Sequence, residues 1–395
     1  MKVAFLTAGG IAPCLSSSIG MLMKKYYDYD NSIEFIGYLH GYKGLLKGDK
    51  IALSSNNLEN INTFGGSLLG NSRVKLTNIK DCIKNGYIAN NQKPLEVAAS
   101  QLIKDEIDIL HTIGGDDTNI TAGELLEFIT KQDYKIAVIG LPKTIDNDIY
   151  PIKQTLGSFT AADQTARFFR NIVNENTTSS RQLIIHEVMG RNCGWLTAYS
   201  AFLYNKSLDN KTFLPELNLS KEKWDIHAIY IPELDFDLRK ESKRLSLIMD
   251  NHDCVNIFLS EGAGLNIIIE EMKNNNEKIQ YDAFGHVRLD EINPGIWFGE
   301  YFKKSLNADK VLVQKSGYFA RSSKPNNDDI NLINKTVEKA FNCALNMKSC
   351  VVGLHQDTDN IECIDISEIQ GGKPFNINED WFIELLKSIN QSIQK

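Results

Sequence analysis

The sequence lacks the features that would assign it to a membrane, zinc-binding or disulfide-rich class. No apolar run in its 395 residues reaches the ~18–20 residues that cross a bilayer. Its seven cysteines are scattered, odd in number and never spaced as Cys-x-x-Cys, which favours reduced buried thiols over zinc sites or disulfides. The chain starts directly with the strand-like run 2–7, so we expect no signal peptide and a cytoplasmic location.

The chain also lacks an excess of positive charge, because its net charge is -7. An acidic chain has no general attraction for nucleic acid or for an anionic membrane, although a locally basic phosphate pocket is still compatible with it. No internal repeat or low-complexity linker is evident in the sequence. Since domains usually have ~100–200 residues, we expect two of them.

Two apolar runs between residues 107 and 148 end in polar loops that contain most of the candidate chemistry. The run 107–113 leads into Gly114-Gly115-Asp116-Asp117-Thr118 and then into a helical pattern. The run 135–141 stops at Pro142 and opens into Lys143-Thr144-Ile145-Asp146-Asn147-Asp148. Ligands of parallel α/β sheets bind beyond the carboxyl ends of the strands, so we expect both loops to face a common pocket.

Glycines and acids in these loops indicate a phosphate site that includes a metal ion. Glycine lets the backbone approach phosphate, and the amino end of the following helix favours an anion. Carboxylates in the same place would repel phosphate unless a cation lay between them. We therefore expect Asp116 or Asp148 to hold Mg²⁺, which usually takes one or two carboxylates together with phosphate oxygens.

Other apolar runs end in similar loops along the chain. Taken singly, each loop is weak evidence, since a turn often needs glycine for its backbone angles and a single charge is usually solvated. The loops are Ala8-Gly9-Gly10, the glycine-spaced segment 64–73 with Arg73, Met189-Gly190-Arg191 after run 182–188, Glu261-Gly262 after run 254–259, and Gly317-Tyr318-Phe319-Ala320-Arg321 after run 310–314.

Taken together and in this order, the motifs resemble the phosphofructokinase family, in particular its pyrophosphate-dependent branch. The resemblance implies two doubly wound (Rossmann-like) α/β/α domains with the active site in the cleft between them. Residues 1–156, with roughly 318–346, would form the pyrophosphate- and Mg-binding domain. Residues 157–317, with roughly 347–395, would form the domain that binds sugar phosphate.

The resemblance also implies a reaction. The chain would catalyse reversible, Mg-dependent phosphoryl transfer from pyrophosphate to the 1-hydroxyl of fructose 6-phosphate, a step of glycolysis and gluconeogenesis that gives fructose 1,6-bisphosphate and phosphate. We expect a homo-oligomer, with a dimer favoured over a tetramer. The alternatives are an ATP-dependent 6-phosphofructokinase and a catalytically silent regulatory subunit.

Individual residues receive roles from the same resemblance. Asp146 would be the general base, Asp116 the Mg²⁺ anchor, and Asp148 a second acid that orients the metal or the base. Lys143 would stabilise charge on pyrophosphate, and Asp117 would repel the α-phosphate of a nucleotide. Pyrophosphate would be bound by Gly10, Arg73, Gly115 and Thr118. The sugar phosphate would be bound by Thr144, Ile145, Asp146, Met189, Gly190, Arg191, Glu261, Tyr318, Phe319, Ala320, Arg321 and Arg181.

Some assignments stay open on the sequence. Arg181 could reach the sugar 6-phosphate across a subunit interface, or it could be a surface arginine at a strand end. Either His286 or Tyr318 could fill the sugar-contact position, and we favour Tyr318, with 284–302 as an insertion. Any single aspartate in a loop could be a turn or cap residue, so the combination carries the hypothesis.

Overall fold

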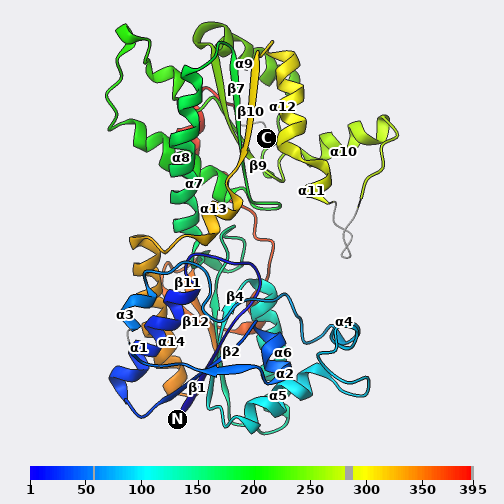
Figure 1. Ribbon diagram of the computed structural model, residues 1–395, viewed down its shortest axis with the longest axis vertical. Helices are drawn as coiled ribbons and strands as arrows, with labels where there is room; N and C mark the ends of the chain where they lie inside the picture. Colours follow the sequence, from blue (N-terminus) through cyan, green and yellow to red (C-terminus); the bar gives the residue numbers. More distant parts are fainter. Residues whose placement is uncertain (57, 281–287, 393–395) are drawn as a thin grey trace. The chain divides into compact units, whose positions relative to one another are not determined.

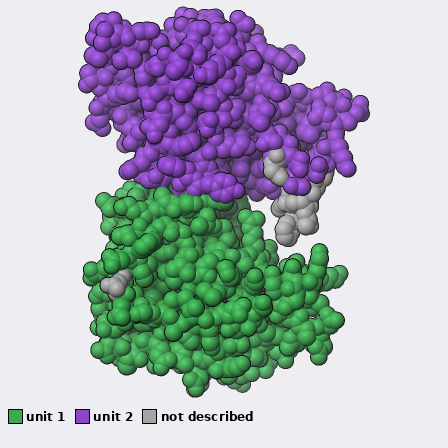
Figure 2. Space-filling view, viewed as in Figure 1, with its two compact units in different colours: residues 1–161, 321–373 green, residues 162–320, 374–395 purple. Residues whose placement is uncertain are grey.

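The computed structural model describes residues 1–56, 58–280 and 288–392, which divide into two compact units (Figures 1 and 2). Unit 1 comprises residues 1–161 and 321–373, and unit 2 comprises residues 162–320 and 374–395. No helix in the described ranges is long and apolar enough to span a bilayer.

Unit 1 is built on a mostly parallel sheet with the strand order β12-β11-β5-β4-β1-β2-β3, and β6 pairs with β11. From β1 the chain continues to β2 on one side and later to β4 and β5 on the other, which is the doubly wound arrangement. Strands β3, β6 and β12 join antiparallel. The strands are β1 (Lys2–Thr7), β2 (Glu34–Tyr38), β3 (Lys50–Ala52), β4 (Ile109–Gly114), β5 (Ala137–Pro142), β6 (Ile152–Gln154), β11 (Cys350–His355) and β12 (Ile361–Ile364).

Helices cover both faces of this sheet, so its central strands are buried apolar runs rather than alternating ones (Figure 1). One face carries α1 (Leu15–Tyr29), α3 (Leu58–Ile61) and α14 (Asn327–Leu345). The other carries α2 (Tyr42–Lys47), α5 (Pro94–Lys104) and α6 (Asp116–Lys131), with α4 (Ile79–Lys84) nearby. A short 3₁₀ helix, Ile366–Glu368, packs against α6.

Unit 2 has a fully parallel sheet with the strand order β10-β7-β9-β8. Its strands are β7 (Gln182–Val188), β8 (Ala228–Tyr230), β9 (Cys254–Ser260) and β10 (Lys310–Lys315). Its helices are most of α7 (Ser158–Ile172), α8 (Trp195–Leu208), α9 (Leu238–His252), α10 (Leu265–Asn274), α11 (Leu289–Ile292), α12 (Pro294–Ser305), most of α13 (Gly317–Ser322) and α15 (Asp380–Ser388). Parallel strands with covering helices in each unit confirm the predicted doubly wound α/β class.

The helix α12 packs into the core of unit 2. Whether 284–302 is an insertion relative to the family stays a prediction, but its second half is part of the core, because Phe298 and Phe302 are 1% and 0% exposed in unit 2. Their spacing of four residues puts both on one helix face. Gly299 lets that face lie close to Val311 and Val313 of β10. The alternative sugar contact, His286, lies outside the described residues.

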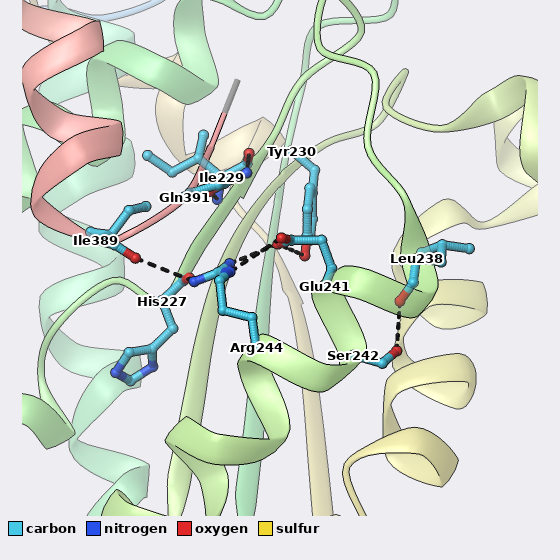
Figure 3. Close-up of polar contacts among 9 residues, drawn as sticks. All are labelled: His227, Ile229, Tyr230, Leu238, Glu241, Ser242, Arg244, Ile389 and Gln391. Atoms are coloured by element: carbon cyan, nitrogen blue, oxygen red, sulfur yellow. Dashed lines mark hydrogen bonds and ion pairs between the residues drawn. The ribbon is translucent and has the colours of Figure 1, made fainter. Parts of the chain in front are cut away.

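A buried polar network fixes the C-terminal segment of unit 2 (Figure 3). Arg244 of α9 donates to Glu241 Oε2 at 2.7 Å, and to the carbonyl oxygens of His227 at 2.8 Å and Ile389 at 3.2 Å. The Tyr230 hydroxyl also donates to Glu241 Oε2, at 2.8 Å. Each charged group is therefore paired and hydrogen-bonded, as burial requires. The network holds Ile389 near β8, and Gln391 bonds directly to Ile229 of that strand.

Candidate active site

In unit 1 the strand order changes direction between β1 and β4, where open α/β sheets bind ligands. The loops that follow these two strands lie against each other, and Ala8 N donates to Ile113 O at 3.0 Å. Gly9 has a φ of +78°. A Cβ built at Gly9 would lie 3.7 Å from both Lys143 Nζ and Thr118 Oγ1. Three loops that are distant in sequence thus converge on one glycine turn.

Lys143 is buried, with 3% of its surface exposed. Its Nζ donates to the Gly10 carbonyl, and its backbone N–H donates to Gly114 O at 2.8 Å. Burial lowers the pKa of Lys143 to about 8, while Asp146 and Asp148 raise it and Arg73 lowers it. Lys143 and these three charged groups are therefore close enough to act on one another electrostatically.

Asn147 holds the loop that carries the aspartates. It has a φ of +58°, a conformation that asparagine tolerates better than most residues. Its Oδ1 accepts from Thr155 N at 2.9 Å, and its Nδ2 donates to Lys153 O at 3.0 Å. The Thr155 hydroxyl also donates to Thr144 O at 2.8 Å. The sequence analysis gives Asn147 no role, although an asparagine between two aspartates is typical of a tight turn.

Asp116 and Asp148 form a carboxylate pair at the carboxyl ends of β4 and β5. Burial raises the pKa of Asp148, and the negative charge of Asp116 raises it further, while Thr144 and Lys373 lower it. A buried acid whose pKa is raised by a second carboxylate favours a bound cation, because a divalent ion removes the repulsion between the two charges. The donor set therefore fits a divalent metal bound through oxygen.

Two residues of this region were missed by the sequence analysis. Gly371 lies so close to Asp116 that a Cβ there would be 1.8 Å from Asp116 Oδ2. Lys373 donates its backbone N–H to Asp148 O at 2.9 Å. Both come from the returning part of the chain after β12. The adjacent glycines 371 and 372 were the available signal, but they do not indicate which loop they approach.

Arg73 and Asp117 lie at the exposed rim of the same loops. The segment before Arg73 is fixed against β1, since Gly9 N donates to Ser72 O at 2.9 Å and Thr7 Oγ1 donates to Gly70 O at 2.9 Å. Asp117 begins α6 next to Asp116 and forms an ion pair with Lys75 at 2.8 Å. Both side chains are therefore exposed at this rim, and a ligand there would meet the Asp117 carboxylate together with its partner Lys75.

Arg321 belongs to the returning segment of unit 1. The residues after it, Ser322 and Ser323, lie against the glycine-spaced loop, because a Cβ at Gly65 would be 2.1 Å from Ser322 O and 2.6 Å from Ser323 O. Only glycine fits such a close backbone contact.

In unit 2 the loops after β7 and β9 meet. The Gly190 N–H donates to Glu261 Oε1 at 3.3 Å, and Ser260 Oγ donates to Gly190 O at 2.5 Å. Gly262 approaches the next residue of the first loop, since a Cβ there would lie 1.8 Å from Arg191 O. Burial raises the pKa of Glu261. The structure thus brings the loop Met189–Arg191 and Glu261 together, while their part in binding sugar stays a prediction.

The loop after β10 joins this group. β10 and β7 end together, with Lys315 opposite Glu187. A Cβ at Gly317 would lie 3.1 Å from Met189 Sδ. Tyr318 and Phe319 are 79% and 51% exposed, whereas Ala320 is buried.

Arg181 lies apart, at the amino end of β7. It donates to Asn307 O at 2.7 Å, Leu306 O at 2.6 Å and Asp250 Oδ1 at 2.8 Å. Leu306 and Asn307 directly follow the last residue of α12. The positive charge of Arg181 therefore lies at the carboxyl end of this helix, where the helix dipole stabilises a cation. Its part in binding sugar phosphate stays a prediction.

Comparisons with known proteins agree with this arrangement. The family model for phosphofructokinase matches residues 2–344. The pyrophosphate–fructose 6-phosphate 1-phosphotransferase of Methylotuvimicrobium alcaliphilum is 53% identical over 99% of this chain and 97% of the relative. That of Mastigamoeba balamuthi is 49% identical over 98% of this chain and 96% of the relative.

More distant proteins share the fold. The ATP-dependent 6-phosphofructokinase of Borreliella burgdorferi is 28% identical over 83% of this chain and 67% of the relative. The crystal structure of pyrophosphate-dependent phosphofructokinase from Marinobacter aquaeolei superposes with a TM-score of 0.72 at 20% identity, over 100% of this chain and 93% of that chain. On the family match and the near-complete coverage by relatives about half identical, the chain belongs to the phosphofructokinase family.

Proposed function

We propose that this chain catalyses reversible phosphoryl transfer from pyrophosphate to the 1-hydroxyl of fructose 6-phosphate, giving fructose 1,6-bisphosphate and phosphate. The observation that carries the proposal is the buried Lys143, whose Nζ reaches the Gly9–Gly10 turn beside Thr118. A buried cation at a glycine turn suits a small, highly charged anion. The relatives that are about half identical bear names with this activity, whereas two relatives named for ATP, from Borreliella burgdorferi and Arabidopsis thaliana, are 28% and 26% identical.

Residues of unit 1 would bind pyrophosphate. The open space at Gly10 lets a phosphate approach the backbone. Arg73 suits phosphate because its guanidinium can donate two parallel hydrogen bonds. Gly115 and Thr118 lie at the amino end of α6, where backbone N–H groups and the helix dipole favour an anion. Lys143 would neutralise the charge that develops on pyrophosphate during transfer.

Members of this family generally need a divalent metal ion, and we propose Mg²⁺ for this chain. Asp116 would hold it, with Asp148 as the second acid that orients the metal or the base. When bound, the ion would neutralise charge on the phosphate oxygens. Gly371 lies directly against the Asp116 carboxylate, and a side chain at position 371 would collide with it. The close contact with Gly371 would therefore keep the carboxylate in place.

Asp146 would accept the proton of the attacking 1-hydroxyl. The Thr144 hydroxyl accepts a hydrogen bond from Asp146 N at 3.2 Å, which fixes the turn from which the carboxylate projects. Thr144 and Ile145 would position the sugar beside this base. A carboxylate can act in this way because the hydroxyl gains acidity as it attacks phosphorus.

Residues of unit 2 would bind the sugar. Glu261, with a pKa raised by burial, suits a hydrogen bond with a sugar hydroxyl. Met189, Gly190 and Arg191 would line the same place, and the exposed loop at 318–320 would add Tyr318, Phe319 and Ala320. Arg321, the first residue of the returning segment of unit 1, would bind the 6-phosphate, and Arg181 of unit 2 is kept as a second candidate. The two units would therefore divide the substrates, with pyrophosphate and metal in unit 1 and most sugar contacts in unit 2.

Asp117 would select pyrophosphate over ATP. Its carboxylate is exposed at the first turn of α6, where it would repel the α-phosphate of a nucleotide but leave room for pyrophosphate. The competing candidate is an ATP-dependent 6-phosphofructokinase. In that enzyme a nucleotide would have to bind beside the side chains of Asp117 and Lys143.

We further propose that the enzyme acts in the cytoplasm as a homo-oligomer, with a dimer favoured over a tetramer. The free thiols support the location, since all seven cysteines lie in the described ranges, six of them are buried and none forms a disulfide. Sedimentation equilibrium of the full chain would distinguish the two assemblies.

The test of the proposed function is fructose 1,6-bisphosphate formation from fructose 6-phosphate and Mg²⁺, with pyrophosphate and ATP supplied separately. We expect product with pyrophosphate only. Product with ATP only would overturn the roles proposed for Asp117 and Lys143. The chain would then be an ATP-dependent 6-phosphofructokinase. No product with either donor would favour a silent regulatory subunit.

A further inference from the structure

Three cysteines that are distant in sequence meet in unit 1. Cys343 lies in α14, Cys350 begins β11 and Cys363 lies in β12, and their Sγ atoms are all within 4.8 Å of one another. The antiparallel register of β11 and β12 places Cys363 opposite Val352. Since side chains alternate along a strand, Cys350 projects from the same face as Val352 and therefore as Cys363. α14 packs on these strands and brings Cys343 to them.

The spacing of the sulfur atoms suits a shared metal ion. A metal–sulfur bond of about 2.3 Å places three sulfurs around one ion at roughly 4 Å from one another. The sulfurs would therefore have to move by less than about 1 Å, which rotations of the side chains can supply. A disulfide would use only two of the three thiols, whereas a metal ion would use all of them.

We propose that Cys343, Cys350 and Cys363 bind one thiophilic metal ion through three thiolates, with monovalent copper as the favoured occupant. Soft thiolate ligands select copper(I) or zinc among biological metals. Zinc in structural sites takes four protein ligands. Within the described ranges, the group contains three cysteines and no histidine, aspartate or glutamate as a fourth member. Three sulfurs in one plane complete the coordination of copper(I) but not that of zinc.

The surroundings provide an entry path and partial charge compensation. Cys343 and Cys350 are 6% and 1% exposed, but Cys363 is only half-buried, so an incoming ion would meet its sulfur first. Burial raises the pKa of Cys343 and of Cys350, so the bound ion itself has to displace their protons. Lys339, one helical turn before Cys343, lowers the pKa of Cys343 and offsets a small part of this. On binding, each S–H proton would leave to solvent and a metal–sulfur bond would replace it, with no change in oxidation state.

The thiol cluster is separate from the candidate active site. Cys350 pairs with Ile139 within β5, whereas the loop with Lys143 begins only after that strand ends. Metal binding should therefore not require either substrate, and it can be measured on the full chain without an activity assay. The proposal stands independently of the proposed function.

The experiment is a titration of the reduced full-length chain with copper(I), added without oxygen as its acetonitrile complex, in competition with the chromophoric chelator bicinchoninate. We expect one ion per chain and a thiolate-to-metal absorption band in the near ultraviolet. The test variant is Cys363→Ser, because its half-buried position should tolerate a hydroxyl. Changing a group that merely contacts a metal ligand already costs about 10–100-fold in metal affinity, so losing a ligand should cost more than ~100-fold.

Controls separate the possible outcomes. Cys82→Ser removes a buried thiol of the same unit outside the cluster and should bind copper(I) as the wild type does. A parallel titration with zinc that shows the same dependence on Cys363 would support the site and reassign its occupant. Equal copper(I) affinity in the wild type and Cys363→Ser would overturn the proposal. The proposal would also be overturned if the reduced chain bound no metal and mild oxidation readily removed two hydrogens from it. That result would show that two of the thiols form a disulfide instead.

Discussion

The two units present loops of different chemistry on sheets of the same kind. In unit 1 the loops after adjacent parallel strands gather the acids at 116, 117, 146 and 148 with the cations Lys143 and Arg73. In unit 2 the corresponding loops present a carboxylate, Glu261, bonded to a backbone N–H, beside the apolar Met189. This difference supports our proposal that unit 1 would handle the charged reaction centre and that unit 2 would recognise the hydroxyl-bearing acceptor.

The strongest test of this contrast is Asp146→Asn. Loss of the general base should lower kcat by ~10²–10⁴-fold and leave KM for both substrates nearly unchanged. The measurement is steady-state kinetics in both directions. Asp28→Asn, which alters an exposed carboxylate paired with Lys24, is the matched control and should behave as the wild type. Near-normal turnover of Asp146→Asn would show that Asp146 is not the general base.

Glu261→Gln should affect recognition instead. A hydrogen bond to a charged group contributes about 1.5–3 kcal/mol, so KM for fructose 6-phosphate should rise by roughly 10–100-fold. KM for pyrophosphate should change little, because Glu261 lies in the loops of unit 2. A larger effect on pyrophosphate than on the sugar would break the division of labour between the units.

Gly371→Ala tests whether Asp116 is positioned for a metal. The added Cβ has no space beside the carboxylate, so the carboxylate must move. We expect the Mg²⁺ concentration for half-maximal rate to rise by about 10–100-fold, the usual range when a group that contacts a metal ligand is disturbed. Saturating Mg²⁺ should restore much of the rate. An unchanged Mg²⁺ dependence would argue against Asp116 as the metal ligand.

The pH dependence should show the smallest effect. The pKa of Lys143 is lowered to about 8, so the side chain is charged below that pH and becomes neutral above it. We expect kcat/KM for pyrophosphate to fall by roughly tenfold per unit above pH ~8. Lys143→Arg keeps its charge at all these pH values and should move the alkaline decline upward, whatever its absolute rate. A decline at the same pH in Lys143→Arg would exclude Lys143 as its cause.

Much of the fold and the composition of the site follow from local sequence. Buried parallel strands are nearly continuous apolar runs, and the polar loops after them mark their carboxyl ends, so the predicted bounds of β4, β5, β7, β9 and β10 lie close to the observed ones. The motifs that resemble the phosphofructokinase family lie in those loops, which is why the amino-acid sequence alone indicates the family.

Other features were decided only by tertiary structure. The packing of α12 in the core of unit 2 is one of them, because periodicity does not tell which helix packs on a sheet. The approach of Gly371 to Asp116 and the meeting of Cys343, Cys350 and Cys363 join segments that are distant along the chain. Such contacts depend on strand order and on the path of the returning chain. The sequence by itself thus determined which groups are available and at which strand ends they lie, whereas the packing of distant segments decided which of them meet.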